Sequence, residues 1–246
     1  GVSAAAVVLR DRQDANALLD QQRNILDATG LAIGEYGIQA EDLDTDQIAT
    51  LNEWISSKLV DLETGDFSEA MDINNYDLLD VTQNAATSIE ITEPEFNPGE
   101  QRRPKVMKVS FVKRPNTEQI QQVVLPVYGK GLWGTLYGYL AVKSDLETIQ
   151  GITFYKHKET PGLGGEVENP KWKVQWEGRK LFDENGNPAS LVYKGPAPPT
   201  NPYAVDGLSG ATITSRGVTN LIRYWVSDDG YGPFLTKMAK ELGDKE

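Results

Sequence analysis

The segment GLSGATITS, residues 207–215, gathers glycines and hydroxyl side chains immediately before a stretch with helical periodicity. The first N–H groups of a helix have no partner within the helix, and the helix dipole adds partial positive charge there, so a helix start can bind an anion such as phosphate. Gly207 and Gly210 would let the backbone approach that anion closely. Serine and threonine before a helix are also typical N-cap residues, and the spacing matches neither the dinucleotide-binding fingerprint nor the P-loop. An anion site and an ordinary cap both remain open.

A second glycine-rich segment, HKETPGLGGEVENP at residues 157–170, follows a predicted strand. Leu163 stands between glycines, where a loop offers little core to fill, so it would suit an apolar contact with a flat ring. Glu159 and Thr160 would supply polar contacts to the same ligand. An ordinary turn with a solvated Glu159 explains the same residues. His157 is interpreted as a residue at the end of the strand and not as a catalyst, because no cysteine or metal-ligand set accompanies it.

The composition excludes several kinds of site. The 246 residues contain 36 acidic and 24 basic side chains, a net charge of −12, and no basic stripe, so no nucleic-acid partner is indicated. The chain has no cysteine and one histidine, which excludes disulfides, iron–sulfur clusters and clustered thiolate or imidazole metal sites. The DENGN segment at 183–187 lacks the ligand spacing of a calcium loop and is interpreted as a hairpin-like turn. Redox chemistry would therefore need a bound organic cofactor.

Periodicity predicts the elements that position the two loops. Apolar residues at helical spacing predict helices at 14–29, 44–62, 218–226 and 231–242. Alternating apolar residues predict strands at 105–114, 119–129, 132–142 and 148–157, and residues 64–105 are interpreted as a long surface connection. The run VSAAAVVLR at 2–10 is too short to span a bilayer, which takes about 20 apolar residues, and it fits either the end of a membrane helix or the first turn of an amphipathic helix. The predicted fold class is α+β, with an antiparallel sheet, flanking helices and a helical N-terminal region.

DGLSGATITS at 206–215 and HKETPGLGGE at 157–166 together resemble the FMN-binding domain family whose flavin is held covalently by a phosphoester to threonine. Within it the sequence is similar to the NqrC family of the Na+-translocating NADH:quinone oxidoreductases, with the corresponding Rnf-type family of the Rnf electron transport complexes as a related alternative. The resemblance is strongest from about Pro126 to Trp225 and includes the run GKGLWGTLYGYLAV. It implies an antiparallel-sheet FMN-binding domain.

The resemblance also implies roles for individual residues. The flavin-bearing threonine corresponds to Thr212, the last letter of SGAT. The surrounding attachment motif comprises Asp206, Ser209, Gly210, Ala211 and Thr214. Residues expected beside the isoalloxazine ring are Glu159, Thr160, Gly162, Leu163 and Gly164, joined by Trp133 and Lys194. A cation at Lys194 would favour a reduced, negatively charged flavin.

The resemblance further implies a one-electron relay subunit of a bacterial Na+-pumping NADH:ubiquinone oxidoreductase. Its partners would be the other subunits of the membrane redox complex and, during maturation, a flavin transferase. Residues 1–100 are expected to form a membrane-proximal helical and mixed region, and residues 101–246 the covalent FMN-binding domain facing the periplasm from the inner membrane. VSAAAVVLR would then be the cut end of a membrane helix. A flavin-free envelope interaction module, in which SGAT is only a cap, is the alternative from a different class.

Overall fold

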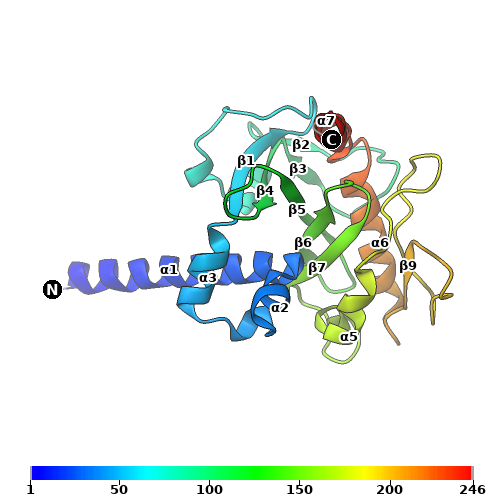
Figure 1. Cartoon of the computed structure of the whole chain (residues 1–246), viewed down its shortest axis with the longest axis horizontal. Coiled ribbons are helices and arrows are strands. Elements are labelled where there is room, and N and C mark those ends of the chain that lie inside the picture. Colours follow the sequence, from blue (N-terminus) through cyan, green and yellow to red (C-terminus); the bar gives the residue numbers. More distant parts are fainter. Residues whose placement is uncertain (1, 245–246) are drawn as a thin grey trace.

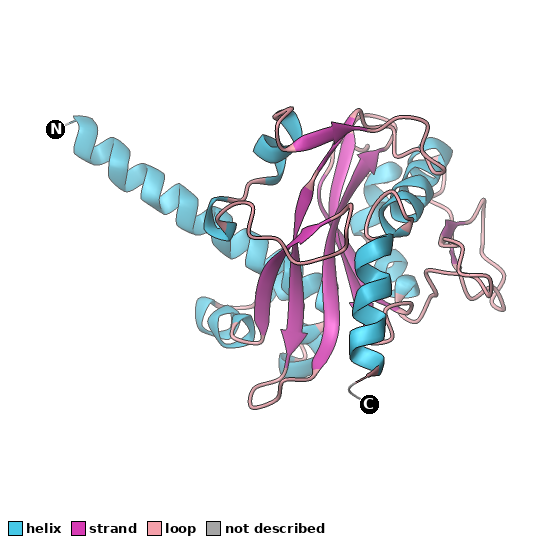
Figure 2. Ribbon diagram, turned by 90° about the horizontal axis from the view of Figure 1, so that it is seen from above, coloured by secondary structure: helices cyan, strands magenta, loops and turns pink. Residues whose placement is uncertain are grey.

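A five-stranded antiparallel sheet forms the centre of the molecule, and helices lie on both of its faces (Figures 1 and 2). The structure is a computed structural model that describes residues 2–244. The strands are, in spatial order, β1 (Ile55–Asp61), β4 (Val106–Lys113), β5 (Ile120–Lys130), β6 (Thr135–Lys143) and β7 (Ile149–Lys156). This arrangement confirms the predicted α+β class and the four predicted strands.

Alternation along the strands divides the apolar side chains between two cores. On β5, Val123 and Leu125 belong to the core under α6 (Thr212–Val226) and α7 (Gly232–Gly243), whereas the intervening Val124 belongs to the core on the opposite face. That opposite face is covered by α1 (Val2–Thr29), α2 (Leu31–Tyr36) and α3 (Thr45–Asn52), with the 3-10 turn η1 (Ala40–Asp42) between α2 and α3. Successive residues of a strand point to opposite faces, so a strand covered on both sides is apolar almost throughout.

The predicted helix after GLSGATITS is confirmed as α6. Its apolar positions Val218, Leu221, Ile222 and Trp225 are fully buried against the sheet. Helix α7 confirms the prediction for 231–242. Gly217 allows α6 to lie very close to the sheet, because a Cβ atom at this position would stand only 2.3 Å from the carbonyl oxygen of Lys130 at the end of β5.

Helix α1 continues well before the predicted start at residue 14, and its residues 3–18 are exposed. In Figures 1 and 2 this part of α1 projects away from the rest of the molecule. None of the helices within residues 2–244 combines the length and the apolar character needed to cross a membrane. The predicted stop at Gly30 is confirmed by a left-handed backbone (φ 70°), a conformation that glycine adopts at little cost.

The last turn of α1 is fixed to β7 by close packing and polar contacts. A Cβ atom on Gly151 would lie 2.4 Å from the carbonyl oxygen of Ala28. Asp27 accepts a hydrogen bond from the Thr153 hydroxyl (2.6 Å) and pairs with Lys173 of the short helix α5 (Pro170–Lys173). The direction of α1 is therefore set by the sheet.

The prediction of one helix over 44–62 is wrong in its second half. Helix α3 ends at Asn52, and residues Ile55–Asp61 form β1, which pairs with β4 from Ile55↔Val112 to Asp61↔Val106. The apolar residues of this segment fit both the helical period and the alternating period of a strand. Pairing with β4 selects the strand. Strand β1 thus joins residues before position 100 to the same sheet as those after it; the division of the chain at residue 100 stays a prediction.

The connection at 64–105 contains short elements: η2 (Ile73–Asn75), α4 (Leu78–Gln83) and the ribbon of β2 (Ser88–Glu90) with β3 (Arg102–Pro104). After β7 come η3 (Gly164–Glu168), α5, η4 (Val174–Trp176) and the parallel pair β8 (Leu191–Val192) and β9 (Ala204–Val205). The predicted turn at DENGN is confirmed, because the amide of Gly186 (φ 79°) donates to the carbonyl of Asp183.

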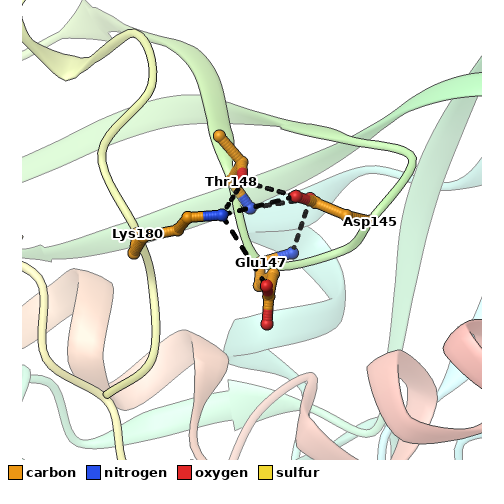
Figure 3. Close-up of polar contacts among 4 residues, drawn as sticks. All are labelled: Asp145, Glu147, Thr148 and Lys180. Carbon is orange, nitrogen blue, oxygen red and sulfur yellow. Dashed lines mark hydrogen bonds and ion pairs between the residues drawn. The ribbon is translucent and has the colours of Figure 1, made fainter. Parts of the chain in front are cut away.

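A polar cluster anchors the segment after η4 to the turn between β6 and β7 (Figure 3). The Lys180 ammonium donates to the Thr148 hydroxyl (2.7 Å) and lies 3.7 Å from carboxylate oxygens of both Asp145 and Glu147. Thr148 in turn contacts Asp145 through its amide and its hydroxyl. This cluster stabilises the end of β6 and β7 opposite to the two glycine-rich loops.

Candidate flavin site

Three segments meet at one end of the sheet. The hairpin 131–134 joins β5 to β6, the loop 157–163 follows β7, and residues 206–211 lead into α6. Because β6 pairs antiparallel with both β5 and β7, the start of β6 lies beside the ends of its two neighbours, with Lys130↔Thr135 and Tyr137↔Lys156 in register. The close approach of α6 at Gly217 brings its first turn over the same end.

The two sequence motifs lie against each other in space. A Cβ atom on Gly210 (φ 69°) would lie 3.0 Å from Leu163 Cδ2, and a Cβ atom on Gly164 would lie 2.6 Å from Thr214 Oγ1. These two glycines are therefore needed for the approach of the loops. Thr160 organises the turn itself, since its carbonyl accepts the amides of Leu163 (3.0 Å) and Gly165 (2.9 Å).

Glu159 links all three segments. The residue is 5% exposed, and its carboxylate accepts hydrogen bonds from the backbone amides of Leu132 (2.7 Å) and Trp133 (3.0 Å) in the hairpin. It accepts a third from the hydroxyl of Thr214 (2.6 Å), which is buried in the first turn of α6. The alternative of a solvated Glu159 is wrong. The side chain is committed to protein donors.

The start of α6 has no side-chain cap within the described residues. The N-cap residue is Ala211 (φ −132°, ψ 54°), so Thr212 is the first helical residue and its side chain is exposed. Ser209 is exposed as well. The Ser215 hydroxyl stabilises this turn, because its Oγ accepts a hydrogen bond from the backbone amide of Leu208 (3.1 Å). The interpretation of SGAT as a side-chain cap is therefore wrong, and the N-cap residue provides no side-chain acceptor for the first amides of the helix.

Asp206 holds the approach to this turn. One carboxylate oxygen accepts the amide of Ala197 (2.8 Å) and the other accepts the side-chain amide of Gln175 (3.2 Å). Its backbone is fixed as well, because the Trp172 indole donates to its carbonyl (2.8 Å) and its own amide donates to Gln175 Oε1 (2.9 Å). Asp206 thus shapes the loop from inside the protein.

Trp133 and Lys194 reach the neighbourhood from different elements. Trp133 lies at the tip of the hairpin and is 64% exposed. Lys194 is exposed in the segment after β8, and this segment runs beside the attachment motif: a Cβ atom on Gly207 would lie 2.3 Å from the carbonyl oxygen of Tyr193. Gly162 (φ 79°) is exposed in the loop after β7.

Four large apolar side chains in the hairpin, the loop after β7 and the first turn of α6 are exposed, although such residues are mostly buried elsewhere. They are Leu132 and Trp133 from the hairpin, Leu163 from the loop and Ile213 from α6. Leu132 and Ile213 were not among the predicted site residues. An apolar, partly aromatic surface next to an uncapped helix start suits a ligand with a flat ring at one end and a phosphate at the other.

The sequence analysis also missed the residues that hold the segment before α6 and the first turns of α6 in place. Ser215 and Gly217 belong to the same TITSRG run as Thr212, so a glycine directly before the predicted helix was the available signal. Trp172 and Gln175 carry no such signal, because their partner Asp206 is distant in sequence. His157 follows β7 as predicted; its Nδ1 accepts the amide of Glu159 and its Nε2 lies 3.2 Å from Glu168.

The site is an open surface and does not coincide with the groove of about 910 Å³ between α1, residues 76–79 and the sheet. That groove is lined by Tyr137, Tyr139 and Tyr155 among others, and by none of the residues of the two motifs. An open position leaves the Thr212 hydroxyl accessible to a large reaction partner.

The fold and this surface define a flavin-binding protein, and the profile of the FMN-binding domain family matches residues 131–227. The chain is 44% identical over 237 residues to NqrC, the C subunit of the Na(+)-translocating NADH-quinone reductase, of Vibrio alginolyticus, covering 96% of this chain and 88% of that protein. It is 43% identical over 242 residues to the Pseudomonas aeruginosa protein of the same name, covering 97% and 90%. The chain belongs to the NqrC family of the Na(+)-translocating NADH-quinone reductases.

Solved structures of this family share the fold. The crystal structure of Shewanella oneidensis NqrC superimposes with a TM-score of 0.79 and 30% identity, covering 89% of this chain and 96% of that one. The NqrC protein of the Na(+)-translocating NADH-quinone reductase from Parabacteroides distasonis superimposes with a TM-score of 0.69 and 28% identity, covering 93% and 97%.

Proposed function

We propose that this protein carries FMN covalently, through a phosphoester bond to the Thr212 hydroxyl. The observation that carries the proposal is the position of Thr212 as an exposed first residue of α6, two residues after Gly210, which lies against the exposed side chain of Leu163. The free amides of the first helical turn and the positive end of the helix dipole favour a phosphate there. The positive φ of Gly210 allows the tight turn that delivers Thr212 to the surface.

The attachment reaction is a phosphoryl-group substitution that uses FAD as donor and a flavin transferase as catalyst. The Thr212 oxygen forms a bond to the phosphorus atom on the FMN side of the pyrophosphate. The bond from that phosphorus to the bridging oxygen breaks, and AMP leaves with the oxygen. The hydroxyl proton passes to a base of the transferase. The exposure of Thr212 and the small residues Ser209, Gly210 and Ala211 before it admit both the enzyme and the donor.

The ring would be held by residues that frame Thr212. Trp133 and Leu163 offer apolar contact, and Glu159, Thr160, Gly162 and Gly164 build the loop on which Leu163 stands. Asp206 and Thr214 fix the two sides of the attachment turn. Lys194 would supply a positive charge from the segment after β8. A flavin held there supplies one-electron transfer.

We further propose that the protein is a one-electron relay within a Na+-pumping NADH:ubiquinone oxidoreductase, because relatives over nearly the whole chain are named as the NqrC component of a Na(+)-translocating NADH-quinone reductase. Its partners would be the other subunits of that complex and, during maturation, the flavin transferase. In this proposal residues 101–246 form the flavin domain and face the periplasm. Residues 1–100 lie nearer the inner membrane.

The test compares intact protein masses after production with and without a flavin transferase. We expect the added mass of one phosphoester-linked FMN only with the enzyme, together with a fluorescent band after denaturing electrophoresis. Without the enzyme the protein should be folded and colourless. Flavin that is removed by denaturant would contradict the covalent bond. Protein that takes up no flavin under either condition would favour the flavin-free envelope interaction module.

A further inference from the structure

Glu159 accepts hydrogen bonds from three donors that come from two separate segments of the chain. The Leu132 amide and the Thr214 hydroxyl both donate to Oε1, and the Trp133 amide donates to Oε2. None of these donors is charged, and no ion pair joins Glu159 to a basic side chain within residues 2–244. The carboxylate therefore acts as a hydrogen-bond acceptor at the junction of the loops.

Neighbouring glycines leave room for this carboxylate. A Cβ atom on Gly131 would lie 2.4 Å from Glu159 Oε1, and one on Gly164 would lie 3.0 Å from Glu159 Cβ. The hairpin and the loop after β7 are thus packed around the side chain as well as bonded to it. A contact of this kind fixes position, because buried hydrogen-bond partners that separate are left unsatisfied.

We propose that Glu159 is a positioning residue, which fixes the hairpin that carries Trp133 to the first turn of α6 that carries Thr212. This inference rests on the proposed function of Thr212 and assigns Glu159 a task different from contact with the flavin. Both carboxylate oxygens are occupied by protein donors, so the side chain sets the spacing between the aromatic surface and the attachment hydroxyl. Thr214, two residues after Thr212, is the point at which α6 is held.

The Glu159→Gln variant separates this role from simple packing. Glutamine has nearly the same shape, but one carboxylate oxygen is replaced by an NH2 group that only donates. In either orientation of the side-chain amide, one of the two hairpin amides faces a donor and loses its acceptor. We therefore expect loss of order in the hairpin without loss of the fold.

The first measurement is amide hydrogen exchange by NMR on the full chain without flavin. In the wild type the amides of Leu132 and Trp133 should both be protected. In Glu159→Gln one of these amides should exchange roughly tenfold faster or more. A hydrogen bond to a charged group shifts the equilibrium toward the closed, protected form of the amide by about a factor of ten. Glu184→Gln is the matched control, because Glu184 is an exposed glutamate in the separate turn at 183–187. Unchanged protection of both amides in Glu159→Gln would overturn the inference.

The second measurement is the rate of covalent flavin attachment with a flavin transferase and FAD. We expect Glu159→Gln to be modified roughly tenfold more slowly than the wild type. A reaction slows when the reacting groups, here the Thr212 hydroxyl and the flavin bound at the hairpin, are displaced from each other. Thr214→Val removes one of the three donors and should slow attachment, and Thr214→Ser, which keeps the hydroxyl, should restore it. Attachment to Glu159→Gln and Thr214→Val at the wild-type rate would overturn the role of Glu159 in positioning.

The two measurements distinguish this inference from the proposed function. If the wild type takes up no flavin, the proposed function of Thr212 fails, and the exchange measurement still decides whether Glu159 fixes the hairpin. If the wild type is modified at Thr212 and the Glu159 variant behaves identically in both measurements, the proposed function holds and the positioning role is wrong.

Discussion

Gly210 lies directly against Leu163, since a Cβ atom on Gly210 would stand 3.0 Å from Leu163 Cδ2. The two residues come from the two separate motifs, and Gly210 also has a positive φ of 69°. The contact joins the attachment turn to the side chain proposed to contact the flavin ring. Any side chain at position 210 would push these two parts of the surface away from each other.

The Gly210→Ala variant should therefore lose stability and flavin together. A non-glycine residue at positive φ costs about 1–2 kcal/mol in the free energy of unfolding. Gly186→Ala is the matched control, because Gly186 has a φ of 79° and open space around it. Both variants should lose similar stability in chemical denaturation, whereas only Gly210→Ala should show reduced covalent flavin in the gel. Equal flavin content in the two variants would show that the contact with Leu163 is unimportant.

Thr212→Ala should abolish covalent flavin with little effect on folding. Because the N-cap is Ala211 and the Thr212 side chain is exposed, we expect the free energy of unfolding to change by no more than about 0.5 kcal/mol. Thr212→Ser keeps a hydroxyl on a freer side chain and should be modified in part. Mass spectrometry of the peptide spanning residues 206–216 checks both variants.

Ser209→Ala is the control for Thr212, since Ser209 offers an exposed hydroxyl in the same turn and should be dispensable. Thr214→Ala should also keep the bond, at a yield reduced by the loss of its contact with Glu159. Flavin found on any residue of the Thr212→Ala peptide would refute the assignment.

Lys194→Ala should lower the reduction potential of the attached flavin, because a nearby cation stabilises the negatively charged reduced forms. The side chain is exposed, so we expect a change on the order of tens of millivolts at low salt and less at high salt. A spectroelectrochemical titration measures it, with Lys143→Ala at the far end of β6 as the control. A potential identical to that of the wild type would place Lys194 away from the flavin.

Stability should fall steeply at alkaline pH. Burial raises the pKa of Tyr224 to about 12, and it also raises the pKa values of Tyr76, Tyr128, Tyr155 and Tyr231 above the ordinary tyrosine value. An unfolded tyrosine deprotonates near pH 10, so above this pH the folded state binds more protons than the unfolded state. The stabilisation is complete below about pH 10 and is lost as the pH rises toward the folded pKa values.

The measurement follows phenolate absorbance and circular dichroism through the same alkaline titration. We expect the phenolate signal of the buried tyrosines to appear together with the loss of secondary structure. In denaturant the same residues should titrate near pH 10 without a cooperative step. Full phenolate formation near pH 10 with intact secondary structure would contradict the burial of these side chains.

The main elements of the fold could be predicted because their signals are local. The apolar face of α6 and the alternating residues of β4 to β7 specify their own structure. Strand β1 could not, since Ile55 and Leu59 satisfy both a helical and an alternating pattern, and only the partner β4 distinguishes them. Residues 2–10 were expected to be helical, but the weak periodicity of this region did not show that they continue without a break into the helix predicted from residue 14.

The two motifs that meet in the structure could be identified from the sequence, because each is a short run of consecutive residues. Thr212 and Leu163 stand in short runs of unusual composition, and the structure brings these runs together. The donors to Glu159 could not be predicted, because two of them are backbone amides, which every residue carries. Asp206 shows the same limit, since its partners Ala197 and Gln175 become neighbours only when the chain folds.

The packing of α1 on β7 connects the long helix to the candidate flavin surface through one strand. Helix α1 has 28 residues and is therefore about 40 Å long, and its last turn rests on Gly151 in the middle of β7. The same strand ends at Lys156, three residues before Glu159. The exposed half of α1 and the proposed attachment residue Thr212 are therefore positioned by the same sheet. A partner that binds this half of the helix would thereby also determine the direction in which the flavin surface faces.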